Sequence, residues 1–276
     1  MTGRPPAAPS PAAPPAELTD VPELPDGWVR ADCHLHTVAS GDAVTTLDQL
    51  AERAARVRLD VVCITDHNEV SAALAASARG IGARVIVGEE VRTPAGDVIG
   101  LFLRERIPYV LPLAEVVRRI RDQGGLVYLP HPFDPVRSSL GDAADSLCAA
   151  GLADIVEIFN AKIKNQALND QSAALAVRWD LPGGAGSDAH DPAGVGAAYL
   201  EMPDFDGPAS FLAALTLARV AGEFRDHAPR YGTKRARDGR DTGGQIGILA
   251  SRAERARSAC WRAASDPSQT AACGSR

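Results

Sequence analysis

The feature that most constrains the fold is a regular alternation of short strand-like runs with longer helix-like segments. Six short strand-like runs recur along the chain, and a segment of helical character separates each from the next: WVRADCHLH, LDVVCITD, RVIVGEEV, GGLVYLPH, ADIVEIFN and DLPGGAGSD. Alternating strands and helices form parallel sheets covered by those helices, so the sequence predicts an α/β domain. A further run, DVIGLFL, follows the turn residues TPAG and predicts a hairpin with the third strand.

The length and charge of the chain set its organisation. A chain of 276 residues can bury one large core, and we expect a single domain over residues 27–222. Residues 1–26 are rich in Pro and Ala without apolar periodicity, which predicts a disordered, flexible arm rather than a signal peptide. Residues 223–276 carry eleven Arg and Lys against six Asp and Glu, which predicts a basic, flexible tail. The whole chain has a net charge of −6, so with +5 on the tail, residues 1–222 carry −11. Such an acidic body disfavours nucleic acid as a partner.

Cysteine usage and hydropathy indicate the compartment. The five cysteines have no C-x-x-C spacing, and their odd number argues against a closed disulfide framework. Cys33 is expected in the core, on the opposite face of its strand from the neighbouring histidines. No window approaches 18 apolar residues without a charge, so no membrane span is expected. We therefore expect a cytoplasmic protein.

Five of the six histidines end or follow a strand-like run: His34, His36, His67, His131 and His190. In an open doubly wound sheet, functional groups gather at one switch point, whereas a closed barrel brings the carboxyl ends of all its strands into one ring. The histidines therefore favour a barrel. We predict a distorted (β/α)7, TIM-like barrel.

Two pairs of polar residues have the i, i+2 spacing that places side chains on one face of a strand. His34 and His36 form the first pair, and Asp188 and His190 form the second. Each pair can chelate an ion. Taken alone, either pair could instead consist of interior residues that are satisfied by hydrogen bonds. His67 by itself could equally be a ligand or a helix cap. The recurrence of the pair favours a metal site.

Carboxylates beside imidazoles would let several divalent ions share one site without prohibitive repulsion. Glu89 and Glu90 end the run RVIVGEEV, and only one of them can face inward from a strand. Asp42 lies in the turn Ser-Gly-Asp, which could fold its carboxylate back toward the histidines, although a turn Asp is more often structural. The sequence thus offers both ligand types.

These residues form an ordered series of motifs between residues 28 and 206. The series is H-x-H (His34, His36), T-D-H (Thr65 to His67), G-x-E (Gly88 to Glu90), H-P (His131, Pro132) and G-S-D-A-H (Gly186 to His190). It resembles the PHP family, the polymerase-and-histidinol-phosphatase metal-dependent phosphoesterases. The resemblance implies a distorted seven-stranded barrel that holds two or three divalent ions, such as manganese, iron or zinc.

The resemblance also implies a set of ligands for these ions. One ion would be held by His34, His36, Glu90 and Asp188, a second by Glu90 and His131, and a third by Asp42, His67 and His190. Glu90 matches the G-x-E motif, so Glu89 is the second choice. Many family members carry a further histidine in the next strand, where this chain has Ile99.

The expected chemistry follows from ions that lie close together. A metal-bound water would be activated for attack on a phosphate ester, with no serine or cysteine nucleophile. Arg137 in HPFDPVR and Lys162 in EIFNAK follow strand ends and are candidates to hold the phosphate, the alternative for each being a solvated surface charge.

We therefore expect metal-dependent hydrolysis of a small-molecule phosphate ester, such as a nucleotide or a sugar phosphate. One alternative is an exonuclease-type phosphodiesterase, which the acidic body disfavours. The other is a non-catalytic, metal-stabilised interaction domain, which predicts missing ligands.

Overall fold

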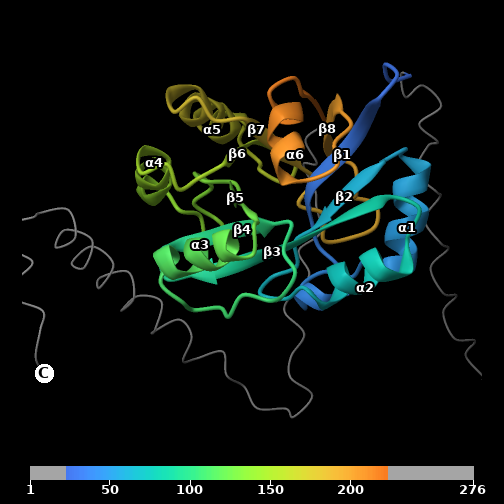
Figure 1. Cartoon of the computed structure of the whole chain (residues 1–276), viewed down its shortest axis with the longest axis horizontal. Helices are drawn as coiled ribbons and strands as arrows, with labels where there is room; N and C mark the ends of the chain where they lie inside the picture. The colour runs from blue at the N-terminus through green and yellow to red at the C-terminus, as the bar shows by residue number, and fades with distance from the viewer. Residues whose placement is uncertain (1–22, 223–276) are drawn as a thin grey trace, which may run out of the picture.

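The computed structural model describes residues 23–222 of the chain (Figure 1). The predicted basic tail, residues 223–276, and all but the last four residues of the predicted Pro/Ala arm lie outside the described residues. Within residues 23–222, no helix is long and apolar enough to cross a membrane.

Over residues 23–222, nine strands form one sheet in the order β7-β6-β5-β4-β3-β2-β1-β8-β9. Neighbouring strands are parallel from β1 to β3 and from β5 to β7, while β4 is antiparallel to both of its neighbours. The predicted hairpin is therefore confirmed as β3–β4. The strands are β1 (Trp28–Leu35), β2 (Val61–Ile64), β3 (Arg84–Thr93), β4 (Gly96–Leu101), β5 (Leu126–Leu129), β6 (Ile155–Asn160), β7 (Gly183–Gly186), β8 (Ala198–Pro203) and β9 (Arg219–Gly222).

The sheet closes on itself because one edge of β1 pairs with β2 and the other edge contacts two different segments. Its first half pairs with β8, and its last residues meet the chain that leaves β7. There the Asp188 N–H donates to the His34 carbonyl at 2.7 Å, and the His36 N–H donates to the Ala189 carbonyl at 3.0 Å. The seven strands β1–β7 form a nearly closed barrel, which confirms the predicted distorted seven-stranded fold. The antiparallel strands β8 and β9 extend the sheet beyond it.

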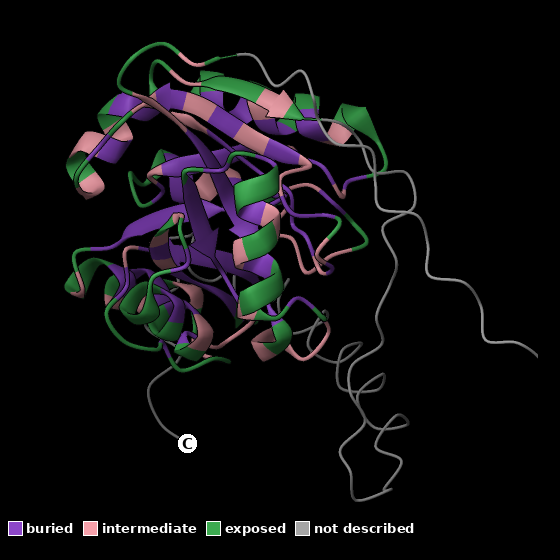
Figure 2. Cartoon of the chain, turned by 90° about the vertical axis from the view of Figure 1, so that its right-hand side faces the viewer, coloured by how far each residue is buried: buried purple, intermediate pink, exposed green. Residues whose placement is uncertain are grey.

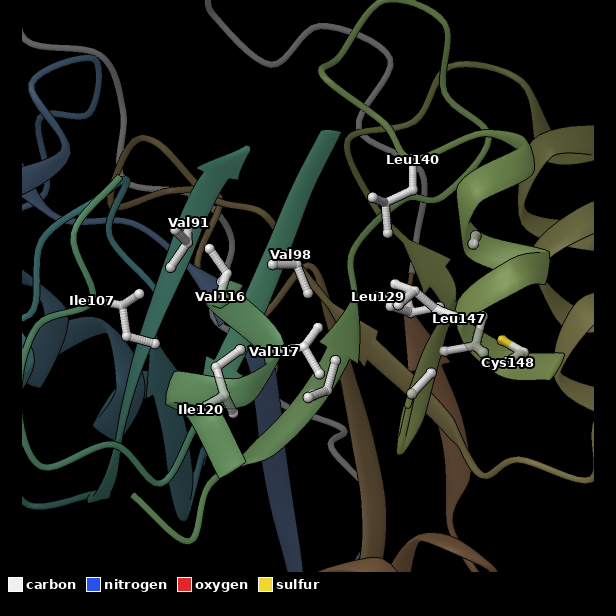
Figure 3. Packing of buried hydrophobic residues seen from close by; sticks show 14 of the residues in the cluster. Val91, Val98, Ile107, Val116, Val117, Ile120, Leu129, Leu140, Leu147 and Cys148 are labelled. Atoms are coloured by element: carbon white, nitrogen blue, oxygen red, sulfur yellow. The ribbon is translucent and has the colours of Figure 1, made fainter. Parts of the chain in front are cut away.

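Helices cover the outside of the barrel, and the exposed residues lie on their outer faces and in the loops that join the elements (Figure 2). Helices α1 and α2 pack on β1 to β3, while α3, α4 and α5 pack on β3 to β6 around Val98, Val117, Leu129 and Leu147 (Figure 3). The helices are α1 (Leu47–Arg56), α2 (Ser71–Arg79), α3 (Leu113–Asp122), α4 (Asp142–Ala149), α5 (Gln166–Arg178), α6 (Pro208–Leu215) and the 3-10 helix η1 (Val38–Ser40).

The interior cluster takes apolar side chains from all seven barrel strands and from α6, and it includes Cys33, Cys63 and Tyr128. The sequence analysis placed Cys33 in the core on the face opposite the histidines. Cys33 is buried, but a register shift between Asp32 and Leu35 interrupts the alternation, so Cys33 packs in the interior beside His34.

Glycines in β7 leave room for this interior. A Cβ on Gly186 would lie 2.4 Å from the His34 Cβ, and a Cβ on Gly184 would lie 2.3 Å from the Tyr128 ring. The run GGAG therefore lets β7 approach the side chains that carry the site.

Candidate metal centre

The five predicted histidines meet at the carboxyl ends of the barrel strands. His34 lies near the end of β1 and His36 directly follows it, while His67, His131 and His190 follow β2, β5 and β7. The His36 ring lies 4.4 Å from that of His67 and 4.3 Å from that of His190, and the His34 ring lies 5.5 Å from that of His131, between centroids. Four strand ends thus build one cluster of imidazoles. The sixth histidine, His227, lies outside the described residues.

Glu90 on β3 and Asp188 after β7 bring carboxylates into this cluster. In the part of the chain that the structure describes, three groups of donor atoms have all members within 4.8 Å of one another. They are His34 with Glu90 and His131, His34 with His36 and Asp188, and His36 with His67 and His190. Glu90, Asp188 and three of the histidines, His34, His36 and His131, are buried, so these donor atoms converge inside the barrel mouth rather than on its surface.

The donor set fits divalent ions. The Nε2 atoms of His34 and His36 face each other at 3.1 Å, and Glu90 Oε2 is buried without a hydrogen bond although His67 Nδ1 lies 2.9 Å away. Imidazole nitrogens and carboxylate oxygens are ligands that manganese, iron and zinc share. A shared cation would satisfy atoms that the protein leaves facing one another.

Electrostatics keeps the acidic donors ionised. Burial alone would raise the pKa of Glu90, but His67 and His34 hold it well below its usual value. The same holds for Asp188, whose pKa is lowered by Lys162, His34 and Arg137 against the effect of burial. The centre therefore contains buried carboxylates that need positive charge beside them.

The imidazoles differ from one another. Burial, with His190 and His67 nearby, lowers the pKa of His36 well below its usual value, which keeps this ring neutral and able to bind an ion. For His67, burial is outweighed by the carboxylates of Glu90 and Asp42, which raise its pKa to about 10. An ion at His67 must therefore displace a proton.

Two of the donor residues have backbone conformations that are rare outside glycine. His131 has φ of 28° and Asp188 has φ of 48°. Such strain persists only where the surroundings hold it, and it gathers at functional sites. Here the N–H groups of both residues are fixed by short hydrogen bonds, to Glu157 at 2.6 Å and to His34 at 2.7 Å.

The remaining predicted residues of the centre lie as follows. Asp42 Oδ2 is 3.5 Å from both His67 Nε2 and His190 Nε2. Glu89 turns away and accepts the Ile107 N–H at 2.7 Å, in line with the choice of Glu90. Ile99 is fully buried directly opposite Glu90 in the β3–β4 pair, so it offers no donor there.

Arg137 and Lys162 both lie against Asp188. Arg137 Nε is 3.1 Å from Asp188 Oδ2, and Arg137 also pairs with Asp134. Lys162 Nζ is 3.4 Å from Asp188 Oδ1 and 2.8 Å from His190 Nδ1. Each side chain is 19% exposed, so both charges sit at the rim of the centre rather than in bulk solvent.

The sequence did not predict the residues that hydrogen-bond to the candidate ligands. Ser40 lies 2.9 Å from His36 Nδ1, accepts the His67 N–H and donates to Asp66 at 2.7 Å. Glu157, fully buried on β6, contacts His34. The only signal for Glu157 was a charged residue inside the apolar run ADIVEIFN, while nothing distinguishes Ser40 from an ordinary loop serine.

Comparison with known proteins finds sequence relatives and family matches. The PHP domain family matches residues 32–129, and the PHP-associated family matches residues 166–220. Two uncharacterised proteins of Methanocaldococcus jannaschii are similar in sequence. MJ1587 is 34% identical over 166 residues, covering 56% of this chain and 94% of the relative, and MJ0417 is 33% identical over 199 residues, covering 68% and 80%.

Solved structures share the fold. A two-domain Bacteroides vulgatus protein containing a predicted PHP-like metal-dependent phosphoesterase has a TM-score of 0.59 at 19% identity, over 74% of this chain and 68% of that one. PsfC of Pseudomonas syringae has a TM-score of 0.55 at 16% identity, over 84% and 99%. The lesion-specific endonuclease EndoQ of Pyrococcus furiosus has a TM-score of 0.50 at 18% identity, over 65% and 53%.

The barrel and its donor set define the class, a PHP-type barrel with a candidate site for divalent ions at its mouth. The family follows from the sequence matches: the chain belongs to the PHP family, as its motifs predicted.

Proposed function

We propose that this protein hydrolyses small-molecule phosphate monoesters at the barrel mouth with two or three divalent ions. The observation that carries the proposal is the placement of Arg137 and Lys162, which lie together on Asp188 at the edge of the donor cluster. Cationic donors beside a metal centre are what a phosphate group requires.

The eight proposed ligands are those that the sequence predicted: His34, His36, Asp42, His67, Glu90, His131, Asp188 and His190. Glu90 lies at the middle of the set, with its oxygens 2.9 Å from His67, 3.1 Å from His131 and 3.4 Å from His36. Bound divalent ions would supply an activated water and neutralise the charge of the phosphate. In this proposal, Glu90 would be shared between two ions.

Arg137 and Lys162 have separate tasks in this proposal. Arg137 is held by the carboxylates of Asp134 and Asp188, which fix the direction of its guanidinium group while part of the side chain stays accessible. Lys162 ends a flexible side chain, and its ammonium group can move from His190 to a phosphate oxygen. The first would orient the phosphate, and the second would balance its charge.

Two observations support a small monoester over the alternatives. The charge of −11 on residues 1–222 repels a nucleic-acid strand, which argues against an exonuclease. All eight predicted ligands lie at one centre, whereas a non-catalytic domain would be expected to have lost some of them.

A hydrolysis screen tests the proposal. The purified protein, loaded in turn with manganese, iron and zinc, is assayed on phosphomonoesters and on phosphodiesters, including single-stranded DNA, with Asp188→Ala as the inactive control. We expect monoester hydrolysis that Asp188→Ala abolishes. Faster cleavage of diesters or DNA would favour the nuclease, and no turnover by protein that holds its ions would favour the non-catalytic domain.

A further inference from the structure

Glu157 is a buried carboxylate that no motif singled out. It lies on β6 with no more than 1% of its surface exposed, and it is surrounded by hydrogen-bond donors. Its Oε1 lies 2.9 Å from His34 Nδ1 and 3.0 Å from the Tyr128 hydroxyl. Its Oε2 accepts the His131 N–H at 2.6 Å and an Asn160 amide N–H at 3.0 Å. One carboxylate therefore contacts two proposed ligands from different strands.

The contact with His34 determines which ring nitrogen can bind an ion. A carboxylate that faces Nδ1 keeps the proton on that atom, which leaves the Nε2 lone pair free. His34 Nε2 points into the donor cluster, 3.1 Å from His36 Nε2 and 3.6 Å from Glu90 Oε2. Glu157 thus fixes both the tautomer and the orientation of His34.

The contact with His131 acts on the backbone. His131 has φ of 28°, and its N–H is held by Glu157 while its carbonyl accepts the Ser139 hydroxyl at 2.6 Å. In this conformation, His131 Nε2 lies 3.1 Å from Glu90 Oε1. Glu157 therefore offsets the strain that brings His131 into the cluster.

The neighbouring histidine is supported differently. His36 Nδ1 faces the neutral hydroxyl of Ser40, and that hydroxyl donates a hydrogen bond to Asp66. A direct carboxylate makes an imidazole a stronger ligand than a hydroxyl does. The two imidazoles of the H-x-H pair are therefore not equivalent.

We propose that Glu157 is a positioning residue that assembles His34 and His131 for metal binding. The proposal rests on the proposed function only in that the ligands bind divalent ions, and it can be tested without any substrate. Glu157 does not touch the phosphate or the reacting atoms in this account.

The substitution Glu157→Gln tests it. One glutamine amide nitrogen must replace one carboxylate oxygen, so it will face either His34 Nδ1 or the His131 N–H, and one of the two contacts is lost. Tyr128→Phe is the matched control, because it removes a hydrogen bond to the same carboxylate without touching a ligand. Zinc affinity is measured for both by competition with a chelator, and circular dichroism checks the fold.

We expect Glu157→Gln to weaken zinc binding about 10- to 100-fold and Tyr128→Phe to leave it close to wild type. Wild-type affinity in Glu157→Gln would overturn the proposal. An equal loss in both variants would also overturn it, since the carboxylate would then act through general packing.

A measurement on the wild-type protein keeps the test decisive if Glu157→Gln does not fold. In the zinc-loaded protein, nitrogen-15 NMR reports which imidazole nitrogen carries the proton and which binds zinc. We expect His34 to bind through Nε2 and to show a low-field Nδ1–H proton. Zinc on Nδ1, or the absence of that proton, would refute the role of Glu157.

Discussion

The substitution Glu89→Gln tests how two adjacent glutamates divide their roles. Glu89 and Glu90 alternate on β3, so their side chains point to opposite faces of the strand. Glu89 is fully buried, with Oε2 bonded to the Ile107 N–H and Oε1 without a partner. Burial is the main cause that raises its pKa from 4.5 to about 7. The folded protein therefore prefers this carboxyl protonated.

The sign and size of the effect follow from this pKa. Because the folded pKa lies above the unfolded one, Glu89 costs little below pH 4.5, destabilises the fold increasingly between pH 4.5 and 7, and has its full effect above pH 7. The difference between these two pKa values corresponds to a loss in the free energy of unfolding of about 3 kcal/mol at pH 8, against about 1 kcal/mol at pH 5. Glutamine is neutral at both values and still offers an oxygen to Ile107.

Urea unfolding of wild type and Glu89→Gln at pH 5 and pH 8, with equal metal content, measures the effect. The variant should become more stable relative to wild type by about 2 kcal/mol between the two pH values. It should also retain its ions, whereas the matched variant Glu90→Gln should lose them. A stability difference that does not change with pH, or loss of ions from Glu89→Gln, would refute this division of roles.

Three further outcomes are expected. Asp188→Ala or His36→Ala should abolish hydrolysis without unfolding the barrel, because both side chains lie at its mouth; circular dichroism and activity check this, and turnover at the wild-type rate would show that the ligands are misassigned. Arg137→Ala and Lys162→Ala should each lower kcat/KM by roughly 10- to 150-fold while the metal content is kept, and unchanged kinetics would make both residues surface charges. Removing ions with a chelator should lower the Tm, because the buried carboxylates of the centre lose their counter-charge, and zinc should restore it; an unaffected Tm would mean that the ions bind weakly.

The strand–helix alternation predicted the α/β sheet, the histidines at strand ends favoured its closure into a barrel, and the turn TPAG predicted the hairpin. The apolar strand-like runs and the turn residues are local signals, and they place the seven barrel strands correctly. The two strands that the sequence analysis missed lack such signals. RVAG in β9 is short and mostly exposed. In β8, burial alternates along AYLEMP, but the residue types do not, because Tyr199 occupies a half-buried position between buried Ala198 and Leu200.

The candidate centre was also predicted only in part. Its histidines and carboxylates occur in short motifs at strand ends, so their convergence could be predicted from the sequence. Glu157 is 123 residues from His34, and a contact at that separation leaves no trace in one sequence. The register shift in β1, which puts Cys33 beside His34 in the interior, arises from pairing with β2 and cannot be inferred from β1 alone.

The central claim is that this barrel mouth holds a multinuclear metal centre. Elemental analysis of the purified protein, after metal-replete expression and gentle purification, tests it most directly. The eight converging ligands predict at least about two divalent ions per chain, falling markedly in Asp188→Ala. Less than about one ion per wild-type chain would contradict the multinuclear centre.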